Sequence, residues 1–171
     1  MSIPEKENSV SGTKKKVGFA QAQKKISSFC AYQERCEMEV RNRLEEWGLA
    51  PTEADRIISK LREQDFLNEH RFADSFVRGK FGLKKWGKVR IRQELKMREL
   101  PNPLIQEAID AIDGEEYLDT LRFLADRKWK LTREPDLYKK KAKVTRFLAF
   151  RGFEPDLIRD AVDWLASERD I

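Results

Sequence analysis

The sequence predicts an all-α protein built from three tandem three-helix repeats of helix-turn-helix type, which together form an elongated, curved rod. Three observations favour this fold class. One spacing of apolar residues recurs three times along the chain, and a proline marks the start of the last helix in each copy. No segment of useful length has the alternating apolar pattern of a β-strand. Repeats of this kind stack their units in a line.

The last helix of each repeat carries the clearest form of the pattern. Its apolar residues fall at positions i, i+3, i+4 and i+7, which form one face of an α-helix. The matching residues of the three copies are Ala54, Ile57, Ile58 and Leu61; Ile105, Ala108, Ile109 and Ile112; and Ile158, Ala161, Val162 and Leu165. Pro51, Pro103 and Pro155 stand just before these helices, where a fixed φ and a missing N–H are best tolerated. We expect Asn102 to be an N-cap in the second copy.

The middle helix of each repeat precedes this proline. Residues 40–44 align with residues 91–95 and with residues 144–148. The residues that stand where the three middle helices should end are Gly48, Glu99 and Gly152. A glycine at such a point is typical of a helix that ends in a left-handed backbone conformation.

The first helix of each repeat closes the core that a helix pair would leave open. The expected ranges of these helices are 17–33, 68–83 and 115–131. The repeats are therefore predicted to span residues 17–65, 66–114 and 115–171. Residues 1–16 mix Ser, Gly, Lys and Glu without periodicity, which predicts a flexible basic arm.

The composition limits the classes of function. The net charge of +5 favours acidic partners such as nucleic acid, but the excess is modest for a chain with 38% charged residues. Cys30 and Cys36 lack a second Cys/His pair, so neither a zinc site nor a disulfide framework is indicated. The N-terminal region has no apolar stretch for a signal peptide or a membrane span. We expect a cytoplasmic protein without membrane association, and a monomer.

Catalytic patterns are missing from the sequence. His70 is the only histidine, and neither a G-x-S-x-G elbow nor a phosphate-binding G-x-x-x-x-G-K-[ST] loop occurs. Glu45 and Glu46 are adjacent, so on a helix their carboxylates point about 100° apart rather than at one substrate atom. We therefore expect no enzymatic activity, no catalytic residue, no metal and no cofactor.

Positive charge is concentrated in the middle helices of the second and third repeats. Lysines and arginines of the second repeat follow steps of three or four residues along a face away from Ile91 and Leu95. This stripe consists of Lys85, Lys88, Arg92 and Lys96. The full set of candidate residues for binding nucleic acid or a filament is Lys84, Lys85, Lys88, Arg90, Arg92, Lys96, Lys139, Lys140, Lys141, Lys143, Arg146 and Arg151. We expect one continuous basic track, with an ordinary solvated helix face as the alternative.

The tryptophans are less informative. Trp86 and Trp129 could stack on nucleic-acid bases, whereas Trp47 and Trp164 lie in helices at positions that could be core. We expect core packing for all four.

The central repeat carries a pattern that resembles a known family. Its residues are Phe66-Leu67-Asn68-Glu69-His70-Arg71-Phe72-Ala73, then Val77-Arg78, then Gly87-Lys88-Val89-Arg90-Ile91-Arg92-Gln93-Glu94-Leu95. This pattern is similar to the central signature of the RecX family, the bacterial regulatory proteins that modulate the RecA recombinase. The resemblance spans the chain from about Phe29 to the carboxyl terminus, and the family has the same three-unit architecture.

The resemblance implies a function in DNA repair, homologous recombination and the SOS response. A RecX protein lies in the helical groove of the RecA filament on single-stranded DNA and inhibits its ATP hydrolysis, strand exchange and co-protease activity. The expected partners are therefore the RecA filament and single-stranded DNA, with double-stranded DNA left open. A protein–DNA filament would also suit the mixed charge of this chain.

Two other classes of function stay open. A stand-alone DNA-binding protein of helix-turn-helix type would use the middle helix of a unit as its reader and bind duplex DNA without a recombinase. A purely structural helical scaffold would bind neither.

Overall fold

The computed structural model describes residues 16–169, and within this range the chain forms nine α-helices and no β-strand. The helices are, in chain order, α1 (Phe19–Tyr32), α2 (Glu37–Glu46), α3 (Pro51–Glu63), α4 (Glu69–Gly82), α5 (Lys88–Met97), α6 (Asn102–Asp110), α7 (Gly114–Leu131), α8 (Leu137–Arg151) and α9 (Pro155–Arg169). The predicted all-α fold class is confirmed. The arm predicted for residues 1–16 lies, except for Lys16, outside the described residues.

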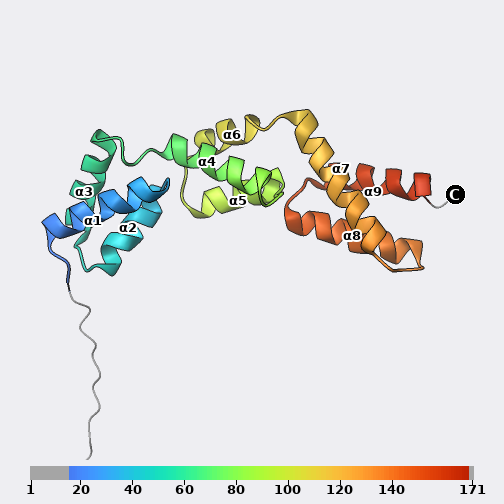
Figure 1. Cartoon of the computed structure of the whole chain (residues 1–171), viewed down its shortest axis with the longest axis horizontal. Helices are drawn as coiled ribbons and strands as arrows, with labels where there is room; N and C mark the ends of the chain where they lie inside the picture. The colour runs from blue at the N-terminus through green and yellow to red at the C-terminus, as the bar shows by residue number, and fades with distance from the viewer. Residues whose placement is uncertain (1–15, 170–171) are drawn as a thin grey trace, which may run out of the picture.

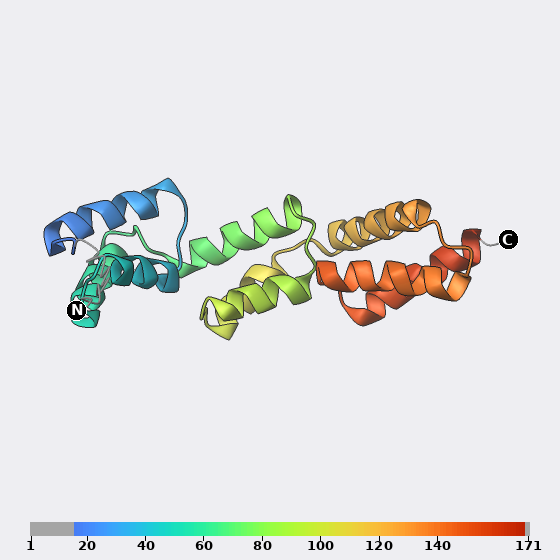
Figure 2. The ribbon, with the colours of Figure 1, turned by 90° about the horizontal axis from the view of Figure 1, so that it is seen from below.

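The helices are arranged in three groups of three. Figure 1 shows α1–α3 at one end of an elongated molecule, α4–α6 in the middle and α7–α9 at the other end. The row is bent rather than straight, and the view from below in Figure 2 shows the same linear order. The predicted repeat architecture is confirmed, whereas the unit boundaries after residues 16, 65 and 114 stay predictions.

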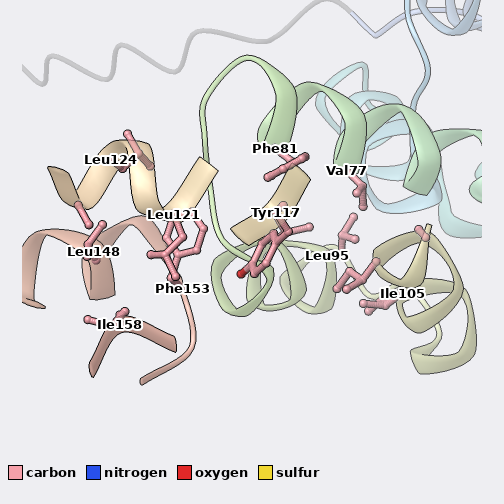
Figure 3. Close-up of a cluster of buried hydrophobic side chains, with 14 of the residues drawn as sticks. Val77, Phe81, Leu95, Ile105, Tyr117, Leu121, Leu124, Leu148, Phe153 and Ile158 are labelled. Carbon is pink, nitrogen blue, oxygen red and sulfur yellow. The ribbon is translucent and has the colours of Figure 1, made fainter. Parts of the chain in front are cut away.

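The predicted apolar stripes supply the cores. The first unit has a core of its own, in which Ile26, Leu44 and Ile57 are fully buried. The second and third units share one continuous core, which includes Leu95 and Leu148 (Figure 3). Of the residues predicted for the last helices, all are buried except Ile112 and Ala161, which are partly buried and pack against the shared core. Each amphipathic helix is thus held by the burial of one face.

The ends of the middle helices follow the sequence pattern. Gly48 and Gly152 have φ angles of 81° and 93°, which is the left-handed conformation predicted for a glycine at the end of a helix. Glu99, at the same point of the second unit, also adopts a positive φ of 61°. The N-cap predicted at Asn102 is wrong, because α6 begins at Asn102 and Pro101 occupies the N-cap. Pro101 and Pro103 thus flank the first residue of this helix.

Within residues 16–169, none of the helices combines the length and the apolar character that crossing a bilayer requires.

Candidate nucleic-acid interface

The two basic helices, α5 and α8, meet end to end at the joint between the second and third units. The Gly87 N–H donates to the Arg151 carbonyl at 2.8 Å, and the Val89 N–H donates to the Gly152 carbonyl at 2.9 Å. The last carbonyls of α8 therefore satisfy the first N–H groups of α5, which have no partner within their own helix. Both views show α8 ending where α5 begins (Figures 1 and 2). The helix dipoles align favourably in this arrangement.

Two glycines allow this close approach. A Cβ atom on Gly87 would lie 2.2 Å from the Gly152 carbonyl oxygen. A Cβ atom on Gly152 would lie 2.2 Å from the Cβ atom of Arg90, and the positive φ of Gly152 disfavours any other residue. The end-to-end contact thus depends on the absence of a side chain at both positions.

Arg90 and Arg151, both predicted as contact residues, bridge this joint. Arg90 donates from Nη1 to the Phe150 carbonyl at 3.3 Å, and its guanidinium carbon lies 3.9 Å from the centre of the Trp86 ring. Arg151 donates from Nη1 to the Lys84 carbonyl at 2.6 Å. These side chains make contacts within the protein, so they hold the two basic helices together.

Tyr117 forms the buried centre of the same joint (Figure 3). Its hydroxyl accepts a hydrogen bond from the Lys88 N–H at 2.9 Å and donates one to Glu154 at 2.5 Å. The ring lies between Phe81 and Phe153, with centroid distances of 5.7 and 5.3 Å. Burial, together with the hydrogen bond to Glu154, raises the pKa of Tyr117 far above its ordinary value. The hydroxyl is therefore a permanent donor at neutral pH.

On α5, three cations lie along one stripe, and the first of them, Lys88, holds its ammonium 4.7 Å from the centre of the Tyr117 ring at the joint. Lys88, Arg92 and Lys96 follow one another at intervals of four residues, so they share a helix face. Arg92 and Lys96 form no ion pair with any residue of the described chain. Lys85, predicted on the same stripe, is not on this helix: it precedes α5 with a φ of 56°, because the chain turns there to enter the helix.

The basic residues of α8 are divided among three surroundings. Lys139, Lys143 and Arg146 share the face opposite the buried Val144 and Leu148. Lys143 pairs with Glu134 at 2.7 Å and lowers the pKa of that carboxyl. The other two lysines point to neighbouring helices: Lys141 pairs with Asp163 at 2.7 Å, and Lys140 lies 4.6 Å from the centre of the Trp129 ring.

An open groove of about 530 Å³ lies between the carboxyl-terminal parts of α7 and α8. Four cations line it, together with the rings of Phe147 and Phe150; the cations are Lys128, Arg133, Lys143 and Arg146. Phe147 and Phe150 are absent from the residues predicted for the site. For Phe150 the sequence does hold a signal. It stands four residues after Arg146, and so on the basic face of α8 rather than on its core face.

The four tryptophans differ in burial. Trp129 is 2% exposed, which confirms core packing, and Trp47 and Trp86 are half-buried against the cores. The expectation for Trp164 is wrong, because its side chain is 55% exposed on α9.

The side chains that could bind a metal ion do not form a cluster in the described part of the chain. Within residues 16–169, no three His, Cys, Asp or Glu side chains lie together as a metal would require. His70 is exposed on the surface of α4. Burial raises the pKa of both the Cys30 and the Cys36 thiol to about 11, so that both stay protonated near neutral pH.

Models of one protein family match most of the described chain. The first, second and third three-helix domains of RecX match residues 28–61, 68–109 and 115–162. The fold is also that of two solved structures. A crystal structure of regulatory protein RecX has a TM-score of 0.73 and 25% identity, covering 85% of this chain and 73% of the other. The structure of RecX from Lactobacillus salivarius has a TM-score of 0.76 and 20% identity, covering 87% of this chain and 97% of the other.

Curated relatives agree. Regulatory protein RecX of Clostridium botulinum (strain Eklund 17B / Type B) is 32% identical over 130 residues, which are 75% of this chain and 60% of the relative. The chain thus spans less than two thirds of that relative's length. Regulatory protein RecX of Pseudomonas savastanoi pv. phaseolicola is also 32% identical over 130 residues, and here 81% of the relative is covered. With all three domains matched in order, the chain belongs to the RecX family of regulatory proteins.

Proposed function

We propose that the protein binds the RecA recombinase filament on single-stranded DNA and inhibits its ATP hydrolysis, strand exchange and co-protease activity. It acts as a cytoplasmic monomer. Its binding causes the inhibition without any catalytic step, and it needs no cofactor. The observation that carries this proposal is the end-to-end contact of α8 and α5 through Gly87 and Arg151. It joins two basic helices into one long surface, which suits an extended, charged partner such as a filament.

Within this surface, we assign different roles to the candidate residues. The outward stripes of α5 and α8 contact the filament or its DNA; they consist of Arg92, Lys96, Lys139, Lys143 and Arg146. Arg90 and Arg151 support the surface by bridging the joint, and Lys88 supports it through its contact with the Tyr117 ring. Of the remaining candidates, Lys84 and Lys85 add positive charge at its edge, whereas Lys140 and Lys141 hold α8 to its neighbours through Trp129 and Asp163.

Charge reversal tests the proposal. Arg92→Glu combined with Arg146→Glu should weaken binding to the filament and reduce the inhibition of DNA-dependent ATP hydrolysis by RecA. For each phosphate that the variant no longer binds, the slope of log affinity against log salt should also fall by about 1. Both side chains lack an ion-pair partner among the described residues, so the helical content should not change.

The matched control is Lys24→Glu combined with Lys60→Glu, which makes the same change of charge on the exposed surfaces of α1 and α3. It should inhibit like the unmodified protein. An unmodified protein that leaves ATP hydrolysis unchanged over a wide titration would contradict the proposal, as would equal losses in the test and control variants.

The stand-alone reader of duplex DNA is a weaker candidate. A recognition helix contacts base edges with its amino-terminal residues, and the amino-terminal end of α5 is covered by α8 through the bonds of Gly87 and Val89. Gel-shift titrations with duplex DNA and no recombinase separate this function from the proposed one.

A further inference from the structure

Phe150 is an exposed aromatic residue within a cationic groove. Its side chain is 74% exposed, although α8 buries Val144 and Leu148 on its other side. Arg146 stands one helical turn before it, and both residues line the groove together with Lys128 and Lys143. A phenyl ring at this position adds nothing to the core, whereas an exposed aromatic ring among cations is a common feature of nucleic-acid-binding surfaces.

Contacts between cations and rings continue from Phe150 across the joint into the second unit. The Arg90 guanidinium carbon lies 5.1 Å from the centre of the Phe150 ring and 3.9 Å from that of Trp86. The Lys80 ammonium lies 4.7 Å from the centre of the same Trp86 ring and 5.3 Å from that of Phe76. The result is a row of alternating rings and cations that spans two units.

Arg90 is placed to fix the ring of Phe150. Its guanidinium contacts both Trp86 and Phe150, and the same group donates to the Phe150 carbonyl. A ring held in one orientation loses little conformational freedom when a planar ligand stacks on it. Arg90 is therefore a positioning residue for Phe150.

We propose that Phe150 is a stacking platform for an unpaired base of single-stranded DNA, with Arg146 and Lys143 beside it for the adjacent phosphates. The inference rests on the proposed function and deepens it, because it assigns a base contact to a surface that was predicted from charge alone. In a duplex the faces of the bases are covered by their neighbours, so a stacking platform favours single strands. Cations alone would bind both forms through their phosphates.

The test compares two fluorescent probes of equal length and equal phosphate count, without recombinase. One is an oligothymidine, and the other is an oligomer of abasic deoxyribose units. The unmodified protein should bind the oligothymidine more tightly, and Phe150→Ala should weaken this binding by roughly tenfold while leaving binding to the abasic oligomer unchanged. Phe150→Trp should keep the preference for bases. Binding to a duplex of the same length should not respond to Phe150→Ala.

Two control variants sharpen the test. Phe123→Ala removes another exposed ring, 57% accessible on α7, that does not line the groove, and it should change nothing. Arg146→Glu should weaken binding to both probes alike. Circular dichroism checks that Phe150→Ala keeps the helical content, as expected for an exposed side chain.

Equal affinity of the unmodified protein for the two probes would overturn the inference, and so would an unchanged preference in Phe150→Ala. Absence of any binding to the oligothymidine would overturn it as well. Since no recombinase is present, these outcomes are independent of the ATP-hydrolysis titration, which tests the proposed function by itself.

Discussion

The joint between the first and second units differs from the joint between the second and third. At the second joint the two units share a core, and two backbone hydrogen bonds join the ends of α5 and α8. At the first joint, ion pairs flank the buried Cys36: Arg71 pairs with Glu34 at 2.9 Å, and Arg98 approaches Glu39 at 3.8 Å. No backbone hydrogen bond joins α2 to α5 within the described residues.

The difference follows from two positions in the sequence. Gly87 is the N-cap of α5, and Gly152 ends α8. The corresponding positions of the first joint are Cys36, the N-cap of α2, and Glu99, which follows α5. Cys36 and Glu99 carry the side chains that Gly87 and Gly152 lack, and at this joint no backbone hydrogen bond links α2 to α5 among the described residues. The same repeat therefore gives a closely packed joint in one place and an ion-paired joint in the other.

The largest effect is expected from adding one methyl group at the second joint. Gly87→Ala places a Cβ atom where the Gly152 carbonyl lies, so we expect a loss of about 1–3 kcal/mol in the free energy of unfolding and a change in the small-angle X-ray scattering profile. Gly79→Ala, on α4, is the control, since apart from the backbone of its own helix nothing lies within 4 Å of the added Cβ. It should stabilise the protein by about 0.5–1 kcal/mol. A Gly87→Ala variant with an unchanged free energy of unfolding would contradict the close approach of α8 and α5.

A smaller effect is expected for Tyr117→Phe. The change leaves the Lys88 N–H and the Glu154 carboxylate without their partner, at a cost of about 1–2 kcal/mol in chemical denaturation. The pKa of Tyr117 is raised in the folded state, so unfolding at high pH releases its proton and the stabilisation is lost as pH rises above about 10, the value of a free tyrosine. The stability difference between the two proteins should therefore shrink above that pH. A constant difference up to about pH 11 would contradict this role.

The smallest effect is expected at the first joint. Exposed and half-exposed ion pairs contribute about 0–1 kcal/mol and are screened by salt. Arg98→Met should therefore cost less than Tyr117→Phe. In a Cys30→Ala background, thiol labelling of Cys36, which is buried at this joint, should become several-fold faster at about 1 M than at about 0.1 M salt. A labelling rate independent of salt would show that the ion pairs do not hold this joint.

The fold could be predicted because its signals are local. Residues such as Ile57, Ile109 and Val162 repeat at helical spacing, and burial follows directly from that spacing. The end-to-end contact of α8 and α5 could not be predicted in this way. It joins Gly87 to Arg151, which are far apart in the chain, and it depends on a missing Cβ atom rather than on a side chain.

The sequence predicts which basic residues belong to the candidate site, but it does not predict which contact each of them makes. A run of lysines indicates a basic face, yet their ion-pair partners lie elsewhere in the chain: Asp163 for Lys141, and Glu134 for Lys143. Arg90 is another example, since its position in α5 gives no sign that it contacts Phe150 of the next unit. Such contacts arise only when the units are assembled.

The most direct test of filament binding through the joined helices is a cryo-electron microscopy map of the protein on a RecA filament formed on single-stranded DNA. We predict that α5 and α8 remain joined end to end, with Arg92 and Arg146 facing the filament and Phe150 close to the DNA. A bound protein whose basic stripes face solvent, or whose second joint is open, would contradict this prediction.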